Sequence, residues 1–146
     1  MQGLGTKLEL LSEDCLESEL IMRYMYQSNG AGSHRIEGVY RVERENEGER
    51  FSEPDRASNR RLLWHGTKLV NMLSLLKKGL IINPPHAEIT GRAFGDGLYF
   101  ADAFDKSYSY THDGRRGRER DMSEYMLLCD VSLGKCKKVG RKSVSW

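Results

Sequence analysis

The chain has 146 residues, of which 38% are hydrophobic and 30% are charged. This length and composition are typical of one soluble globular domain, and they exclude a second full domain. No apolar run approaches the ~20 residues that a membrane-spanning helix needs, which argues against an integral membrane protein. We also expect no membrane partner. The net charge of +2, from 23 basic and 21 acidic residues, is too balanced to indicate nucleic-acid binding by itself. Because the N-terminus lacks a signal-peptide pattern, we expect an intracellular protein.

Three cysteines, Cys15, Cys129 and Cys136, are odd in number and far apart in the chain. This spacing argues against a disulfide framework and against a zinc site built from paired Cys-x-x-Cys units. We expect reduced, mostly buried thiols and no metal.

Two basic clusters occur in the second half of the chain. One contains Arg115, Arg116, Arg118 and Arg120, and the other contains Lys135, Lys137, Lys138, Arg141 and Lys142. A solvated loop and a loose tail are one interpretation. Nucleic-acid binding is the other, and the absence of interleaved aromatic residues disfavours it.

The first third of the chain predicts a helix and a strand. Apolar residues recur at helical spacing over residues 15–27, after an Asp14-x-x-Glu17 sequence with the character of a capping box. Alternation from Ile36 to Val42 predicts a half-buried strand. Residues 44–58 are polar and are expected to form an exposed connection.

The second half predicts shorter elements. Leu62 to Trp64 is expected to be a short buried strand, followed by a helix that Thr67 caps and Gly79 ends. Leu98 to Ala101 predicts another short strand, and Asp102-x-x-Asp105 predicts the start of a helix.

The last predicted element is the apolar run from Tyr125 to Leu133. It is typical of a central strand buried on both faces.

Residues of a recognition site are concentrated between Asn59 and His112. A short apolar run ends on His65 and Gly66, where a glycine lets a ligand approach the backbone and a histidine supplies a directional hydrogen bond. The segment from Tyr99 to Tyr110 adds aromatic and hydroxyl side chains. Together they indicate a pocket for a flat polar ring.

Six motifs in this region resemble the catalytic domain of poly(ADP-ribose) polymerases, in the DNA-dependent-like branch of that family. They are Leu62-Leu63-Trp64-His65-Gly66-Thr67, Gly79-Leu80, Pro84-Pro85, Thr90-Gly91, Phe94-Gly95-x-Gly97-x-Tyr99-Phe100-Ala101-Asp102 and Lys106-Ser107-x-x-Tyr110. The resemblance implies an α+β fold with a mixed, mostly antiparallel sheet and flanking helices, the ADP-ribosyltransferase fold. We expect one such domain over residues 1–146, with its motif core at 59–134 and a basic tail at 135–146.

The resemblance implies an NAD+ ADP-ribosyltransferase, which transfers ADP-ribose from NAD+ to acceptor side chains and releases nicotinamide. The product is mono- or poly-ADP-ribose. The implied partners are NAD+ and acceptor proteins, with nucleic acid contacted only through domains outside this chain. A nuclear location and a role in DNA repair are implied by the family, with a cytoplasmic location as the alternative.

The resemblance also assigns the site residues. The catalytic set is His65, Tyr99 and Lys106. The Gly66 backbone and Ser107 hydroxyl are expected on the nicotinamide carboxamide, with Tyr110 stacked on the ring, Tyr99 at the pocket wall and His65 on the adenosine ribose. The full set expected to bind NAD+ is His65, Gly66, Thr67, Ser74, Tyr99, Phe100, Ala101, Ser107 and Tyr110.

Three of these residues have ordinary alternatives. Tyr99 and Phe100 are also interpreted as strand residues packed in the core, which is where we expect Phe100. Lys106 either neutralises charge near the reacting ribose or is an exposed helix lysine.

The sequence departs from the family pattern at several positions. Thr67 stands where Ser is common, which keeps the hydroxyl, whereas Ile81 replaces an Arg and Arg92 an aromatic residue, which weakens the expected adenosine contacts. The run from Gly91 to Gly97 lacks the spacing and the following helix of a Rossmann motif.

The family's catalytic glutamate lies on a strand beyond the run that ends at Leu133, and this chain contains no equivalent. A carboxylate on the ribose stabilises the oxocarbenium-like charge, and removing such a group costs ~10² to 10⁴-fold. We therefore expect a C-terminally truncated form. The alternatives are an NAD- or ADP-ribose-binding module with impaired catalysis, or substitution by Glu88 or Glu124.

Overall fold

The computed structural model describes residues 5–28, 34–45, 47–51, 59–82, 94–112 and 123–139. Its elements are β1 (Thr6–Leu10), α1 (Leu16–Gln27), β2 (Tyr40–Arg44), α2 (Glu47–Phe51), β3 (Arg60–Gly66), α3 (Leu69–Lys78), α4 (Phe104–Tyr108) and β4 (Met126–Ser132). In these ranges, no helix has both the length and the apolar character to cross a membrane.

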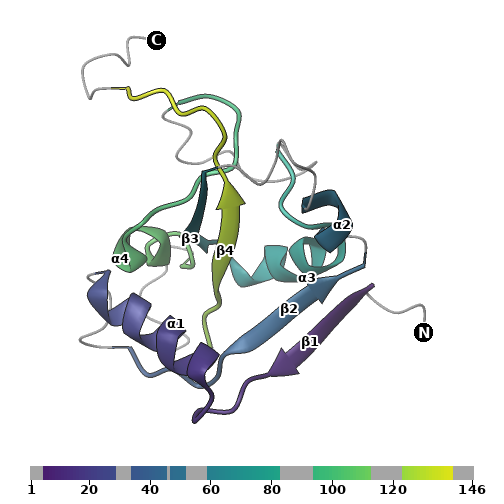
Figure 1. The fold of residues 1–146 in the computed structure, drawn as a ribbon, viewed down its shortest axis with the longest axis vertical. Coiled ribbons are helices and arrows are strands. Elements are labelled where there is room, and N and C mark those ends of the chain that lie inside the picture. The colour runs from purple at the N-terminus through teal and green to yellow at the C-terminus, as the bar shows by residue number, and fades with distance from the viewer. Residues whose placement is uncertain are drawn as a thin grey trace.

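The strands form two antiparallel pairs. β1 pairs with β2, from Thr6 opposite Arg44 to Leu10 opposite Tyr40, and β3 pairs with β4 over the seven residues of each strand. In Figure 1, α1 and α4 lie on one side of the β3–β4 pair, and α2 and α3 lie near the C-terminal end of β2. The expected α+β class with antiparallel strands is confirmed. Within the described ranges, the strands make two separate two-stranded sheets.

β1 and α2 were not predicted, and β2 is shorter than the alternation from Ile36 indicates. β2 begins at Tyr40 because that is where the ladder with β1 begins, after Leu11 N–H donates to the Val39 carbonyl at 2.9 Å. The position of the pairing partner, rather than the side-chain alternation, sets the length of the strand.

Both long helices begin without the predicted caps. The N-cap of α1 is Cys15, whose Sγ accepts from Ser18 N–H at 3.4 Å, in place of the expected Asp14–Glu17 box. The N-cap of α3 is Lys68. Thr67 instead accepts a hydrogen bond at 3.1 Å from the side-chain amide of Asn71.

Gly79 ends α3 as predicted. Its φ is +82°, and its N–H donates to the Leu75 carbonyl at 2.7 Å. A Cβ at this position would lie 2.1 Å from the Arg44 guanidinium, which would have to shift, but it is the positive φ of the turn that requires glycine.

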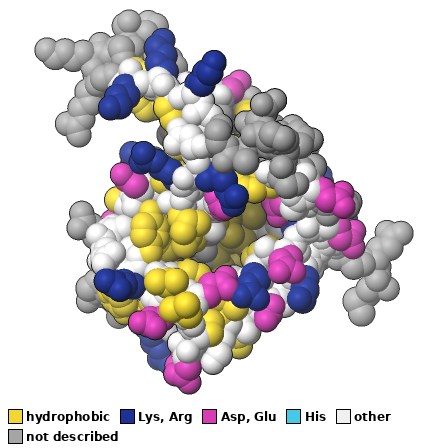
Figure 2. All heavy atoms as spheres, in the orientation of Figure 1, with side chains coloured by type: hydrophobic (Ala, Val, Ile, Leu, Met, Phe, Trp, Pro, Cys, Tyr) yellow, Lys and Arg dark blue, Asp and Glu magenta, His cyan; other side chains and the backbone are white. Residues whose placement is uncertain are grey.

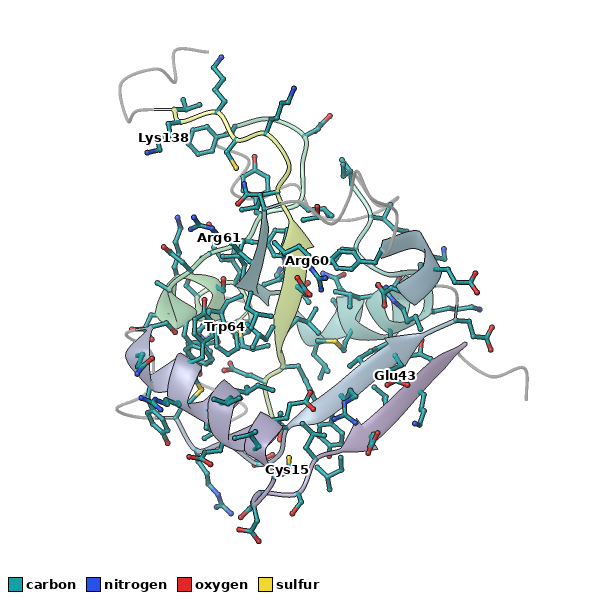
Figure 3. The ribbon with its side chains drawn as sticks, in the orientation of Figure 1. Cys15, Glu43, Arg60, Arg61, Trp64 and Lys138 are labelled. Carbon is teal, nitrogen blue, oxygen red and sulfur yellow. The ribbon has the colours of Figure 1, made fainter. Side chains whose placement is uncertain are left out.

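The core is a cluster of Met25, Trp64 and Phe104, which come from α1, β3 and α4. The Trp64 ring stacks on Tyr24 with centroids 5.7 Å apart and meets the Phe104 ring edge-on at 5.1 Å. The Trp64 indole N–H donates to Ser28 Oγ at 3.2 Å. Figure 3 shows Trp64 between the two helices, so β3 is fixed against α1 and α4 through this side chain.

β4 is not the doubly buried central strand that its apolar run predicts. It pairs with β3 alone among the described strands, and most of its residues are half-buried. Residues of β2 and β4 both line a groove of about 2370 Å³, and hydrophobic side chains gather at the centre of this face in Figure 2. Tyr40 and Val42 of β2 and Leu73 of α3 line this groove as exposed side chains.

The three cysteines are free thiols. Cys15 and Cys129 are half-buried, whereas Cys136 is exposed, so the prediction of mostly buried thiols is wrong for Cys136.

Candidate functional site

The site is built on the edge of β3 that faces away from β4. On that edge, Trp64 exchanges two hydrogen bonds with Ala101: Trp64 N–H donates to the Ala101 carbonyl at 2.8 Å, and Ala101 N–H donates to the Trp64 carbonyl at 2.9 Å. This single bridge replaces the strand predicted from Leu98 to Ala101. It holds the chain that leads into α4 beside β3.

The other residues of this edge follow from strand alternation. In an antiparallel ladder, the N–H and C=O of one residue point to the same edge, and the next residue points to the other. Because the backbone N–H and C=O of Trp64 point away from β4, those of Leu62 and Gly66 do so as well. The Leu62 carbonyl accordingly accepts a hydrogen bond from the Tyr24 hydroxyl at 2.8 Å. Gly66, at the end of the strand, therefore presents one donor and one acceptor beyond the Ala101 bridge.

Gly66 lies in direct contact with the backbone of α4. A Cβ built at this position would be 1.7 Å from the Ser107 carbonyl oxygen, a distance that no side chain tolerates. Ser107 is buried, and its hydroxyl donates to the Trp64 carbonyl at 2.9 Å. The oxygen lone pairs of Ser107 remain to accept a hydrogen bond from a ligand.

His65 is half-buried next to Gly66 at the end of β3, and we call this end of the strand, with Ser107 beside it, the β3 corner. The His65 Nδ1 lies 2.9 Å from the Tyr99 carbonyl oxygen. A carbonyl only accepts, so Nδ1 carries the proton and Nε2 is the acceptor of the neutral ring. Burial lowers the pKa of His65 from 6.5, and the hydrogen bond to Tyr99 opposes that shift. The Phe100 ring packs at 5.6 Å, tilted by 56°.

Tyr99 uses its hydroxyl within its own loop. The hydroxyl donates to the Gly95 carbonyl at 2.6 Å and accepts from Phe94 N–H at 3.1 Å. Gly95 has a φ of +82°, which the turn requires. The residue is 37% exposed, so its ring can form a pocket wall as expected, but its hydroxyl is hydrogen-bonded to backbone groups.

Tyr110 follows α4 in a turn, where its N–H donates to the Ser107 carbonyl at 3.1 Å. The residue is 47% exposed, which leaves its ring available for stacking. Lys106 is an exposed residue of α4, as either interpretation of it requires. Tyr108, in contrast, packs on Phe104 in the core cluster.

The structure brings together some of the predicted site residues and separates others. His65, Gly66, Phe100 and Ser107 meet at the β3 corner, with Ala101 buried beside them. Ser74 is exposed on α3, and Thr67 lies in the turn before that helix. Ile81 is exposed.

Several residues of the sequence prediction lie outside the described ranges. These are Pro84, Pro85, Glu88, Thr90, Gly91, Arg92, the arginines of the 115–120 cluster, Arg141 and Lys142.

Glu124 was named only as a possible substitute acid, and its contacts with His112 and Tyr108 were not predicted. Glu124 hydrogen-bonds His112 and Tyr108, and burial together with this carboxylate raises the pKa of Tyr108 to about 12. The His34 ring packs 4.1 Å from Tyr108. No spacing rule connects these residues, since they come from segments before β2, around α4 and before β4.

Comparison with known proteins identifies the family. The family model for the poly(ADP-ribose) polymerase catalytic domain matches residues 15–145. The chain is 35% identical over 146 residues to poly [ADP-ribose] polymerase 1 of Danio rerio, covering 97% of this chain and 14% of that protein.

Two rice proteins are similar as well. The chain is 41% identical over 133 residues to poly [ADP-ribose] polymerase 2-A of Oryza sativa subsp. japonica, and 42% identical over 134 residues to its poly [ADP-ribose] polymerase 2-B. Each alignment covers 88% of this chain, with 19% of the first protein and 21% of the second. The chain thus spans about a fifth or less of the length of these relatives. It belongs to the poly(ADP-ribose) polymerase catalytic domain family.

Proposed function

We propose that this chain binds NAD+ at the β3 corner and forms part of an enzyme that transfers ADP-ribose from NAD+ to protein side chains, releasing nicotinamide. The observation that carries the proposal is the Gly66 edge. It offers one backbone donor and one acceptor at a position where a Cβ would collide with Ser107.

A carboxamide has complementary groups. Its oxygen accepts from Gly66 N–H, and its amino group donates to the Gly66 carbonyl and to Ser107 Oγ. The second of these contacts uses a lone pair, because the Ser107 proton is already donated to the Trp64 carbonyl. The exposed ring of Tyr110 supplies the aromatic face for nicotinamide.

His65 fits a sugar hydroxyl. With Nδ1 donating to the Tyr99 carbonyl, Nε2 accepts a hydrogen bond from a hydroxyl donor, as the family assignment to the adenosine ribose requires. Lys106, exposed on the same short helix as Ser107, is proposed to lie near the reacting ribose. Thr67, Ser74, Phe100 and Ala101 are proposed to complete the NAD+ contacts.

The reaction breaks the bond between nicotinamide and ribose and forms a bond from the ribose to an acceptor oxygen. A carboxylate that holds the ribose hydroxyl favours this step, because positive charge develops on the sugar. Glu124 is already hydrogen-bonded by His112 and Tyr108, which disfavours it in that role.

The cellular setting is proposed from the family. The acceptors are protein side chains, the product is mono- or poly-ADP-ribose, and the location is nuclear, in DNA repair. Contact with nucleic acid is assigned to other domains.

The binding test uses nicotinamide and benzamide with isothermal calorimetry. Gly66→Ala is expected to abolish measurable binding, and Tyr110→Ala to cost roughly 1 to 3 kcal/mol of affinity through lost stacking. Gly97→Ala and Tyr40→Ala are the matched controls, since a Cβ at Gly97 meets nothing within 4 Å and Tyr40 is an exposed residue of β2. Unchanged affinity in both site variants would refute the site.

The transfer test uses NAD+ labelled in its adenosine part. Label covalently attached to the chain or to added acceptor protein supports the transferase. Tight binding without label would show that this chain is a binding module and does not catalyse transfer by itself.

A further inference from the structure

Tyr99 makes hydrogen bonds both through its side-chain hydroxyl and through its backbone carbonyl. Its side-chain hydroxyl is hydrogen-bonded to Phe94 and Gly95, and its backbone carbonyl accepts from His65 Nδ1. The same residue therefore closes a loop and holds the imidazole.

The carbonyl of Tyr99 is fixed from both directions along the chain. Two residues later, Ala101 is bound to Trp64 by two backbone hydrogen bonds, and Trp64 is the neighbour of His65 in β3. On the other side, the hydroxyl closes the turn from Phe94 to Tyr99. The carbonyl thus has little freedom to move away from His65.

The consequence lies in the tautomer of His65. A neutral imidazole has one N–H and one lone pair, and a fixed carbonyl opposite Nδ1 selects the form whose lone pair is on Nε2. The tilted Phe100 ring packs against the imidazole and restricts its rotation. If Tyr99 moved, both ring nitrogens would compete for the proton.

We propose that Tyr99 is a positioning residue. Its hydroxyl closes the 94–99 loop, and its carbonyl thereby holds His65 with Nδ1 protonated, so that Nε2 can accept a hydrogen bond from a ribose hydroxyl. Tyr99 acts through His65 and needs no contact of its own hydroxyl with the ligand. The part that concerns ribose rests on the proposed function, whereas the tautomer of His65 does not.

The test compares the wild-type chain, Tyr99→Phe and the control Tyr40→Phe. Tyr99→Phe keeps the aromatic ring and removes only the hydroxyl that closes the loop. Tyr40 lies in β2, and its substitution tests for a general effect of losing a tyrosine hydroxyl.

The readout is ¹⁵N NMR of the His65 ring in the absence of ligand. The wild type and Tyr40→Phe are expected to show a protonated Nδ1 and an unprotonated Nε2, and Tyr99→Phe a mixture of the two tautomers. An Nε2-protonated ring in the wild type, or an unchanged tautomer in Tyr99→Phe, would overturn the proposal. The wild-type measurement stands even if Tyr99→Phe does not fold.

Ligand binding separates this inference from the proposed function. Tyr99→Phe is expected to weaken NAD+ about threefold to tenfold and to weaken nicotinamide less, because nicotinamide has no ribose. Failure of the wild type to bind either ligand would refute the proposed function alone, since the tautomer is measured without ligand. Equal NAD+ affinity of the wild type and Tyr99→Phe, despite a changed tautomer, would overturn the ribose part.

Discussion

Two regions of the molecule are rich in apolar residues but are packed differently. The packed side is the part of the β3–β4 pair that contacts α1 and α4, and the groove side is the groove between β2 and β4. On the packed side, Trp64 is 3% exposed and is enclosed by α1 and α4. On the groove side, Leu73 is 69% exposed. A two-stranded sheet is only marginally stable without a packed face, so we infer that stability is concentrated on the packed side.

The candidate site lies on the packed side. Gly66 and Ser107 are held together by the same elements that enclose Trp64, and the Trp64 carbonyl itself accepts from Ser107 and Ala101. We infer that the geometry of the site depends chiefly on this core, part of which, with Trp64 and Phe100, also lines the groove.

The largest expected effect comes from removing the central side chain of the core. Trp64→Ala should lower the free energy of unfolding by ~3 to 5 kcal/mol, because it leaves a cavity between α1 and α4. Urea titration followed by far-ultraviolet circular dichroism measures the change.

The matched substitution on the groove side is Leu73→Ala. It should change the free energy of unfolding by less than about 0.5 kcal/mol, since the side chain is already in contact with water. Equal losses of stability in Trp64→Ala and Leu73→Ala would show that the groove is closed in solution and that the two sides do not differ in packing.

The second prediction concerns the face of β4 that carries Cys129. Burial raises the pKa of Cys129 to about 11 from 9.0, although this residue lines the groove. The thiolate fraction near pH 8 is then about 100-fold lower than for an unshifted thiol.

Alkylation with iodoacetamide followed by peptide mass spectrometry tests this difference. Cys129 should react about 100-fold more slowly than free cysteine, whereas the exposed Cys136 should be modified first and provides the internal control. Rapid labelling of Cys129 would mean that water reaches this face of β4.

The residues that meet at the β3 corner could be named from the sequence, whereas their hydrogen bonds could not. His65, Gly66 and Ser107 were identified because they belong to motifs at fixed spacing in the family. That Ser107 donates to Trp64, and that the Tyr99 hydroxyl closes its own loop, was not predicted. Such bonds depend on the distance between segments remote in the chain, and no local pattern encodes that distance.

The fold shows the same limit. α1 and α3 were predicted close to their observed bounds, because helical periodicity is a local property. β1 was missed and β2 was placed too early, since a strand extends only as far as its partner. β4 was predicted as a central strand because its run is apolar, whereas its neighbour on one edge is a groove.

The smallest expected effect concerns pH and the packed corner. Because burial lowers the pKa of His65 below 6.5, the ring stays neutral in the folded chain as pH falls to 6.5, and Nε2 remains an acceptor. The unfolded chain takes up this proton first. The contribution of His65 to stability is therefore present above 6.5 and is lost as pH falls through the lower, folded pKa.

NAD+ affinity should follow the same protonation. We expect it to be constant from pH 8 down to 6.5 and then to fall about threefold to tenfold, as protonation removes the Nε2 acceptor. Nicotinamide is the matched ligand, because it lacks the ribose and should show no such fall. His65→Gln should bind NAD+ more weakly and without this pH dependence, measured by calorimetry over the same range. A fall centred above pH 6.5 in the wild type, or an equal fall for nicotinamide, would show that another group controls binding and that the corner does not shield His65 from water.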